Sequence, residues 1–101
     1  MDVIISRTAN TLAATIDGEI DAANGHVLTT KIGRGIAGGV DEVVIDVAKL
    51  EFIDSSGISR LVELRQMALD AGATFRLTHP APNVRRVLEI TGLLATFGIH
   101  E

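Results

Sequence analysis

Residues 43–57 read V-V-I-D-V-A-K-L-E-F-I-D-S-S-G, and the rest of the chain can be arranged around them. The run opens with three β-branched residues, and a fourth follows Asp46, a pattern typical of a short strand buried on both faces. We interpret residues 49–51 as a short connection, after which Phe52 and Ile53 return to the core. The run ends with D-S-S-G, four small residues after which the spacing of the apolar residues becomes that of a helix.

An amphipathic helix of about four turns is predicted over residues 58–71. One side of its helical wheel carries the apolar residues Ile58, Leu61, Leu64, Ala68 and Ala71. Asp54 or Ser55 is the natural N-cap, because a short side-chain oxygen there accepts an otherwise unpaired backbone N–H. Ser55 and Ser56 should therefore be exposed at the positive end of this helix.

Length, composition and charge limit the class of protein. A chain of 101 residues, 47% hydrophobic and 3% aromatic, predicts one domain with an aliphatic core. A net charge of −4 without a basic cluster argues against binding nucleic acid through its phosphates. The absence of cysteine excludes disulfides and thiolate metal sites, and no apolar run approaches the roughly 18 residues of a membrane span. Since the N-terminus also lacks a leader pattern, we expect a soluble cytoplasmic protein without a cofactor.

The remaining segments complete an α/β pattern. Strands are expected at residues 2–7, 11–17 and 74–78, and helices at residues 22–37 and from Pro82 or Asn83 onward. Asp21 is a suitable N-cap for the first of these helices, although each of the three glycines within it costs about 0.5–1 kcal/mol relative to alanine. The apolar residues 93–99 are expected to cover an edge of the core.

This order of elements predicts a four-stranded mixed sheet, with three parallel strands and an antiparallel edge strand, packed with three to four helices. Residues 18–20 are expected to leave the sheet. Sites in such sheets form outside the carboxyl ends of the parallel strands. Asp21 and the D-S-S-G segment that begins at Asp54 both follow such ends, so they should converge in space although 33 positions separate the two aspartates.

Enzymatic and nucleotide-binding interpretations have little support. Residues 33–38 fit G-x-G-x-x-G, but they close a predicted helix and precede a strand, the reverse of the context that the motif needs. Ser55 could suggest an acyl-transfer triad, yet none of the histidines lies in a nucleophile elbow. These histidines are His26, His79 and His100. Asp46 and Asp54 could suggest a metal dyad, but no histidine stands at ligand spacing, so we predict neither a metal site nor an enzyme.

Four stretches resemble the STAS domain family, in particular the free-standing anti-sigma factor antagonists of bacteria. The central run, extended to V-V-I-D-V-A-K-L-E-F-I-D-S-S-G-I, resembles the family signature. Residues 18–21 (G-E-I-D), 71–77 (A-G-A-T-F-R-L) and 84–93 (V-R-R-V-L-E-I-T-G-L) resemble further family segments. The likeness covers essentially the whole chain, in order and at family-like spacing, and it implies a STAS domain over residues 1–101 with helices packed on a mixed sheet.

The resemblance also implies a phosphorylation-switched binding module. Its partner would be an anti-sigma factor that is also an ATP-binding serine kinase with a histidine-kinase-like fold. The unphosphorylated antagonist would bind this kinase and free the sigma factor, and phosphorylation would separate the pair until a serine phosphatase resets it. By the family's pattern the acceptor is the serine directly after the aspartate, Ser55, with Ser56 as the alternative. Chemistry alone does not separate the two hydroxyls, and a monomer or weak dimer is expected.

The partner-binding face is expected at the start of the helix that follows D-S-S-G and at Asp21, across a groove from that helix. It comprises Asp21, Asp54, Ser55, Ser56, Gly57, Ile58 and Ser59. Ile58 is equally consistent with plain core packing. A second hypothesis is a STAS scaffold or assembly protein, as in a stress-sensing complex or the cytoplasmic part of a lipid transporter, in which phosphorylation is absent or secondary.

Overall fold

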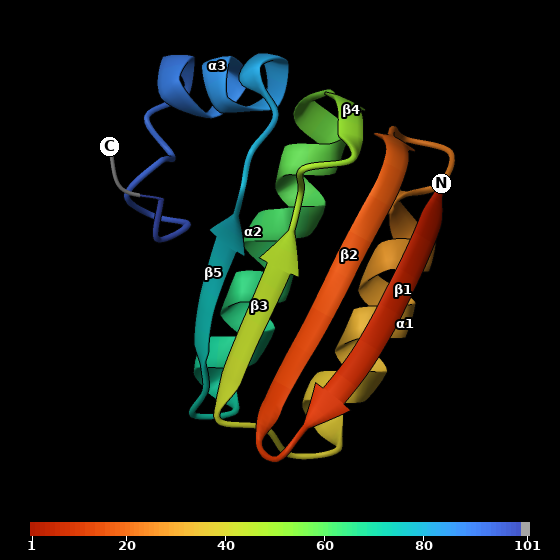
Figure 1. The fold of residues 1–101 in the computed structure, drawn as a ribbon, viewed down its shortest axis with the longest axis vertical. Helices are drawn as coiled ribbons and strands as arrows, with labels where there is room; N and C mark the ends of the chain where they lie inside the picture. Colours follow the sequence, from red (N-terminus) through yellow and green to blue (C-terminus); the bar gives the residue numbers. More distant parts are fainter. Residues whose placement is uncertain (100–101) are drawn as a thin grey trace.

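A computed structural model describes residues 1–99 of the chain (Figure 1). Five strands and three helices follow one another along these residues. They are β1 (Asp2–Thr8), β2 (Thr11–Ile20), α1 (Gly25–Ala37), β3 (Glu42–Asp46), β4 (Leu50–Ile53), α2 (Ser55–Asp70), β5 (Thr74–Thr78) and α3 (Pro82–Ile90). Figure 1 shows α1 and α2 side by side behind the sheet, with α3 beyond the end of β5.

The sheet is mixed, with strand order β1-β2-β3-β5. β1 pairs antiparallel with β2, whereas β2 with β3 and β3 with β5 pair in parallel. The predicted three parallel strands and antiparallel edge strand are therefore confirmed. The structure adds a fifth strand, because β4 also pairs in parallel with β2.

Two expectations around β4 were wrong. Residues 18–20 stay in the sheet as the end of β2, and Leu50 and Glu51 belong to β4 rather than to a connection. The reason is the length of β2: its first half pairs with β3, and its second half is left to pair with β4. The chain bends after β3 and then pairs with the second half of β2 as β4. A hydrogen bond from the Leu50 N–H to the Val47 carbonyl (3.2 Å) closes the bend.

The glycines of α1 permit close packing. A Cβ on Gly33 would lie 2.6 Å from Met67 Cε of α2, and one on Gly35 would lie 2.7 Å from Leu12 Cδ2 of β2. Since contacts this short are essentially never seen, a larger residue at Gly35 would push α1 away from the buried Leu12 side chain of the sheet, whereas one at Gly33 would require only the flexible end of Met67 to shift. Packing thus compensates the low helix propensity of glycine, and the predicted helix forms, although it begins at Gly25 rather than at residue 22.

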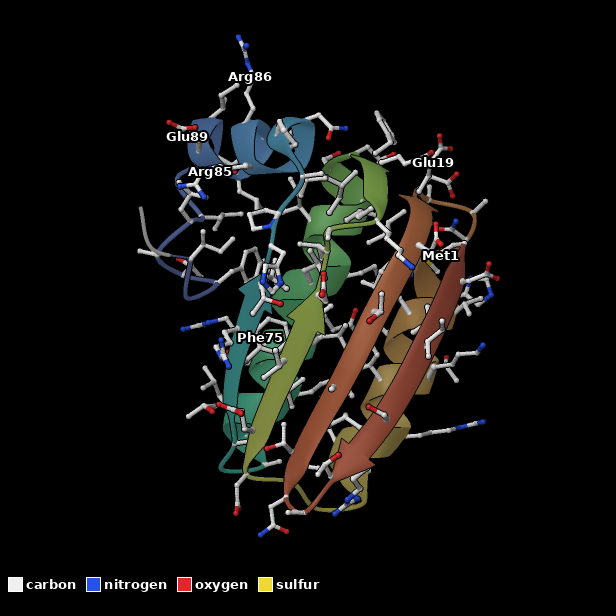
Figure 2. The ribbon with its side chains drawn as sticks, viewed as in Figure 1. Met1, Glu19, Phe75, Arg85, Arg86 and Glu89 are labelled. Atoms are coloured by element: carbon white, nitrogen blue, oxygen red, sulfur yellow. The ribbon has the colours of Figure 1, made fainter. Side chains whose placement is uncertain are left out.

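The C-terminal segment covers the free edge of β5, as expected. α3 begins with Pro82 and is followed by Gly92 at a positive φ of 73°, which turns the chain back. Phe97 is fully buried, with its ring centroid 6.1 Å from that of Phe75. Figure 2 labels Phe75 on β5. The Leu77 N–H donates to the Phe97 carbonyl (2.9 Å), so this edge strand is paired rather than open.

Candidate functional site

The site expected at the carboxyl ends of the parallel strands forms at the junction of β2 and β4. Ile20 and Ile53 are paired Cα partners in adjacent parallel strands. The next residue after each is an aspartate, Asp21 after β2 and Asp54 after β4. Glu19, which precedes Ile20, lies at the same end of the sheet in Figure 2. The two polar segments therefore converge, as the order of elements predicted.

Asp54 is the N-cap of α2. Its backbone is extended (φ −107°, ψ −174°), and its Oδ1 accepts the Gly57 N–H at 3.0 Å. Its carbonyl accepts the Ile58 N–H at 3.0 Å and so begins the helical hydrogen-bond ladder. Of the two N-cap candidates from the sequence, the structure selects Asp54, and Ser55 becomes the first residue of the helix.

The two serines of the site differ in exposure. Ser55 is exposed at the first helical position, as expected, whereas Ser56 is half-buried, so the expectation that both are exposed was wrong for Ser56. One turn further along, the Ser59 hydroxyl donates to the Ser55 carbonyl (3.0 Å). The Ser55 hydroxyl takes no part in this hydrogen bond. Ser55 is thus the more accessible of the two hydroxyl groups that the sequence offered.

Gly57 lets the start of α2 rest directly on the strand ends. It is buried, and a Cβ there would lie 2.7 Å from Ile53 Cγ1 and 2.9 Å from Ile20 Cγ2. Both neighbours are branched core side chains with little room to move. Ile58 is half-buried and packs against the same core. The packing of Gly57 and Ile58 against the core therefore fixes the position of Ser55, which lies in the same turn of α2.

Asp21 does not cap α1, and that expectation was wrong. Its Oδ1 accepts the N–H groups of Ala23 (2.9 Å) and Asn24 (3.1 Å), so it closes a turn that precedes the helix. Asn24 holds the turn from the other side: its Oδ1 accepts the Asp21 N–H (2.9 Å), and its Nδ2 donates to the Glu19 carbonyl (2.8 Å). Asn24 was not among the residues singled out from the sequence, although Asn and Asp side chains both favour turns because they hydrogen-bond to nearby backbone groups.

The other candidate polar residues lie elsewhere. Asp46 bonds locally, since its Oδ1 accepts the Ala48 N–H at 2.9 Å, and its Oδ2 lies 3.5 Å from Nδ1 of the exposed His79. His26 is exposed on α1, and His100 lies outside the described residues. Within residues 1–99, no three or more acidic or histidine side chains are grouped as metal ligands. No helix in the same range has the length and apolarity needed to cross a membrane.

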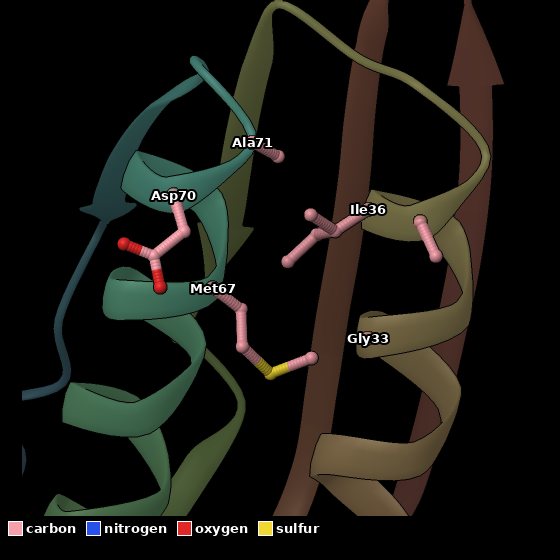
Figure 3. A pocket seen from close by; sticks show the side chains of 6 residues that line it. Gly33, Ile36, Met67, Asp70 and Ala71 are labelled. Carbon is pink, nitrogen blue, oxygen red and sulfur yellow. The ribbon is translucent and has the colours of Figure 1, made fainter.

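A shallow groove between the two long helices is separate from this site (Figure 3). It is lined by Gly33, Ile36, Ala37, Met67, Asp70 and Ala71, which lie toward the C-terminal ends of α1 and α2. α2 has 16 residues and rises about 1.5 Å per residue, so the groove lies roughly 20 Å from Ser55.

Comparison with proteins of known sequence identifies relatives of this chain. An anti-sigma F factor antagonist from Lysinibacillus sphaericus is 31% identical over 88 residues, which cover 85% of this chain and 74% of that protein. The crystal structure of an anti-sigma factor antagonist from Mycobacterium paratuberculosis matches with a TM-score of 0.87 at 26% identity, over 98% of this chain and 84% of that one.

The fold also matches SpoIIAA in two states. The anti-sigma factor antagonist SpoIIAA in its unphosphorylated form gives a TM-score of 0.73 at 29% identity, over 91% of this chain and 82% of that one. The Bacillus cell fate determinant SpoIIAA in the phosphorylated form gives 0.69 at 27% identity, over 95% and 87%. Finally, the family model of the STAS domain matches residues 2–101. Because that match spans nearly the whole sequence, this chain belongs to the STAS domain family.

Proposed function

We propose that this protein is an anti-sigma factor antagonist that is switched by phosphorylation of Ser55. Unphosphorylated, it binds an anti-sigma factor that is also a serine kinase, and the sigma factor is released. The observation that carries the proposal is the placement of Ser55: exposed, first in α2 and directly after the Asp54 cap, in a STAS domain with relatives named as anti-sigma factor antagonists.

The transfer needs little from this chain beyond an accessible hydroxyl. Ser55 Oγ attacks the γ-phosphorus of ATP held by the kinase, and the bond between that phosphorus and the β,γ-bridging oxygen breaks. ADP leaves, and a base of the kinase accepts the serine proton. A serine phosphatase restores the hydroxyl by hydrolysis, which consumes one water and releases inorganic phosphate. This chain therefore acts as a substrate and a binding module, in the cytoplasm, where the sigma factor and its regulators act.

The charge of the phosphate explains the switch. At the start of α2 the group is tolerated, since the positive end of the helix dipole stabilises an anion by about 0.3–1 kcal/mol at an exposed site. Bound to the kinase, the same phosphate would add a charge of about −1.5 to −2 beside the Asp54 carboxylate and would have to lose its water. A like-charge contact can cost several kcal/mol in an interface, so the complex dissociates while the domain stays folded.

Titration calorimetry with the candidate kinase tests the proposal. Ser55→Asp should bind about tenfold or more weakly than the unmodified protein, because it places a fixed negative charge at the switch position. Ser55→Ala should bind like the unmodified protein but accept no phosphate, and Ser56→Ala should both bind and be phosphorylated. Equal affinity of Ser55→Asp and Ser55→Ala would contradict the switch and favour a constitutive scaffold role.

A further inference from the structure

Exposed side chains follow one another along the outer face of α2 in a regular pattern. The buried residues of α2 are Gly57, Leu61, Leu64 and Ala68. On the opposite side, the exposed residues Ser55, Ser59, Val62, Gln66 and Leu69 succeed one another at intervals of four, three, four and three. We call these five residues the outer seam. It spans about 21 Å of helix, since each residue rises about 1.5 Å.

The outer seam carries no charge and two exposed apolar side chains. All five side chains are uncharged, and Val62 and Leu69, one heptad apart, are each 43% exposed. The hydroxyl of Ser59 donates to the Ser55 carbonyl, and Gln66 Nε2 donates to Asp70 Oδ1 (2.8 Å), so two of the three polar side chains are already hydrogen-bonded within the helix. Removing this strip from water would leave few unsatisfied polar groups.

The spacing indicates what the outer seam fits. Intervals that alternate between four and three average 3.5 residues, which keeps a stripe facing a second helix along its length. One flank of the stripe carries two exposed carboxylates, Glu63 and Asp70, also one heptad apart. Arg60 Nη1 lies 3.4 Å from Glu63 Oε2, so this flank keeps one net negative charge. A helix that packs here should therefore present small or apolar residues to the seam and basic residues to this flank.

We infer that the outer seam is the docking surface for a helix of the anti-sigma factor kinase, and that Ser55 is its first position. This inference rests on the proposed function, because Ser55 is both the proposed phosphorylation site and the first residue of the seam. It also explains why one phosphate is sufficient: the modification places a strongly hydrated dianion at the end of a strip whose other positions are neutral. Burying that group against an apolar helix disrupts the contact by desolvation.

Substitutions far from Ser55 test the inference. Val62→Lys and Leu69→Lys change only exposed positions of α2, and each should weaken binding of the unphosphorylated protein to the kinase about tenfold in titration calorimetry. Ile90→Lys is the matched control, because Ile90 is 75% exposed on α3 and lies outside the seam; it should bind within about twofold of the unmodified protein. If a lysine variant loses its helical circular dichroism, Val62→Gln and Leu69→Gln replace it.

The outcomes separate this inference from the proposed function. If Ser55→Asp is weakened while the Val62 and Leu69 variants bind normally, the switch stands and the seam is overturned. If the unmodified protein does not bind the kinase, the proposed function fails, and the inference fails with it. If light scattering shows a dimer that Val62→Lys separates into monomers, the seam belongs to a second copy of this chain, which also overturns the inference.

Discussion

Two strand-to-helix junctions lie side by side in this domain, and they begin alike. β2 and β4 are parallel neighbours, and each is followed at once by an aspartate. After Asp21 the carboxylate closes a turn, and α1 begins only at Gly25. After Asp54 the carboxylate caps the helix, and α2 begins at the next residue, Ser55. The number of residues between aspartate and helix decides whether the next residue is the first of a helix, and only the junction after Asp54 has a serine at that position.

Substituting the glycines should give the largest difference in the free energy of unfolding between the two junctions. A Cβ on Gly57 would meet Ile53 and Ile20 in the core, whereas one on Gly25 would meet the flexible side chain of Arg60, 2.8 Å from its Cγ. Gly57→Ala should lower the free energy of unfolding by about 1–3 kcal/mol through overpacking. Gly25→Ala should change it by less than about 0.5 kcal/mol, because the arginine can move aside. Urea denaturation measures both, and equal losses would contradict this account of the packing.

Removing the aspartates should give a smaller difference of the same sign. Asp54→Ala removes the N-cap of a four-turn helix and should cost about 0.5–2 kcal/mol in the free energy of unfolding. Asp54→Asn is the control, since an asparagine oxygen also caps well. Asp21→Ala should cost less, because Asn24 still donates to the Glu19 carbonyl.

Hydrogen exchange localises these two losses. Asp54→Ala should speed exchange of the Gly57 amide, and Asp21→Ala that of the Ala23 and Asn24 amides, because these N–H groups lose their acceptors. A larger loss of stability for Asp21→Ala than for Asp54→Ala would show that the turn, and not the cap, is the more important of the two junctions.

The sequence was sufficient wherever a local pattern carried the information. The apolar face of α2, the β-branched run of β3 and the Asp54 cap all follow from spacing and from the chemistry of single residues. These local patterns are enough to place Ser55 at an exposed helix start.

The missed features depend on contacts between distant segments. β4 forms because β2 is long enough to pair with two strands, and no pattern within residues 49–51 predicts a pairing with β2. The turn at Asp21 depends on Asn24, which competes with the helix for the same backbone groups.

The most direct test of the central claim is peptide mapping by mass spectrometry after incubation with the candidate kinase and ATP. The account predicts one added phosphate, on Ser55, which disappears in Ser55→Ala and persists in Ser56→Ala. The exposed and half-buried positions of the two hydroxyls are the physical reason for this preference. No phosphate on Ser55, under conditions in which the same kinase modifies a known substrate, would contradict the switch.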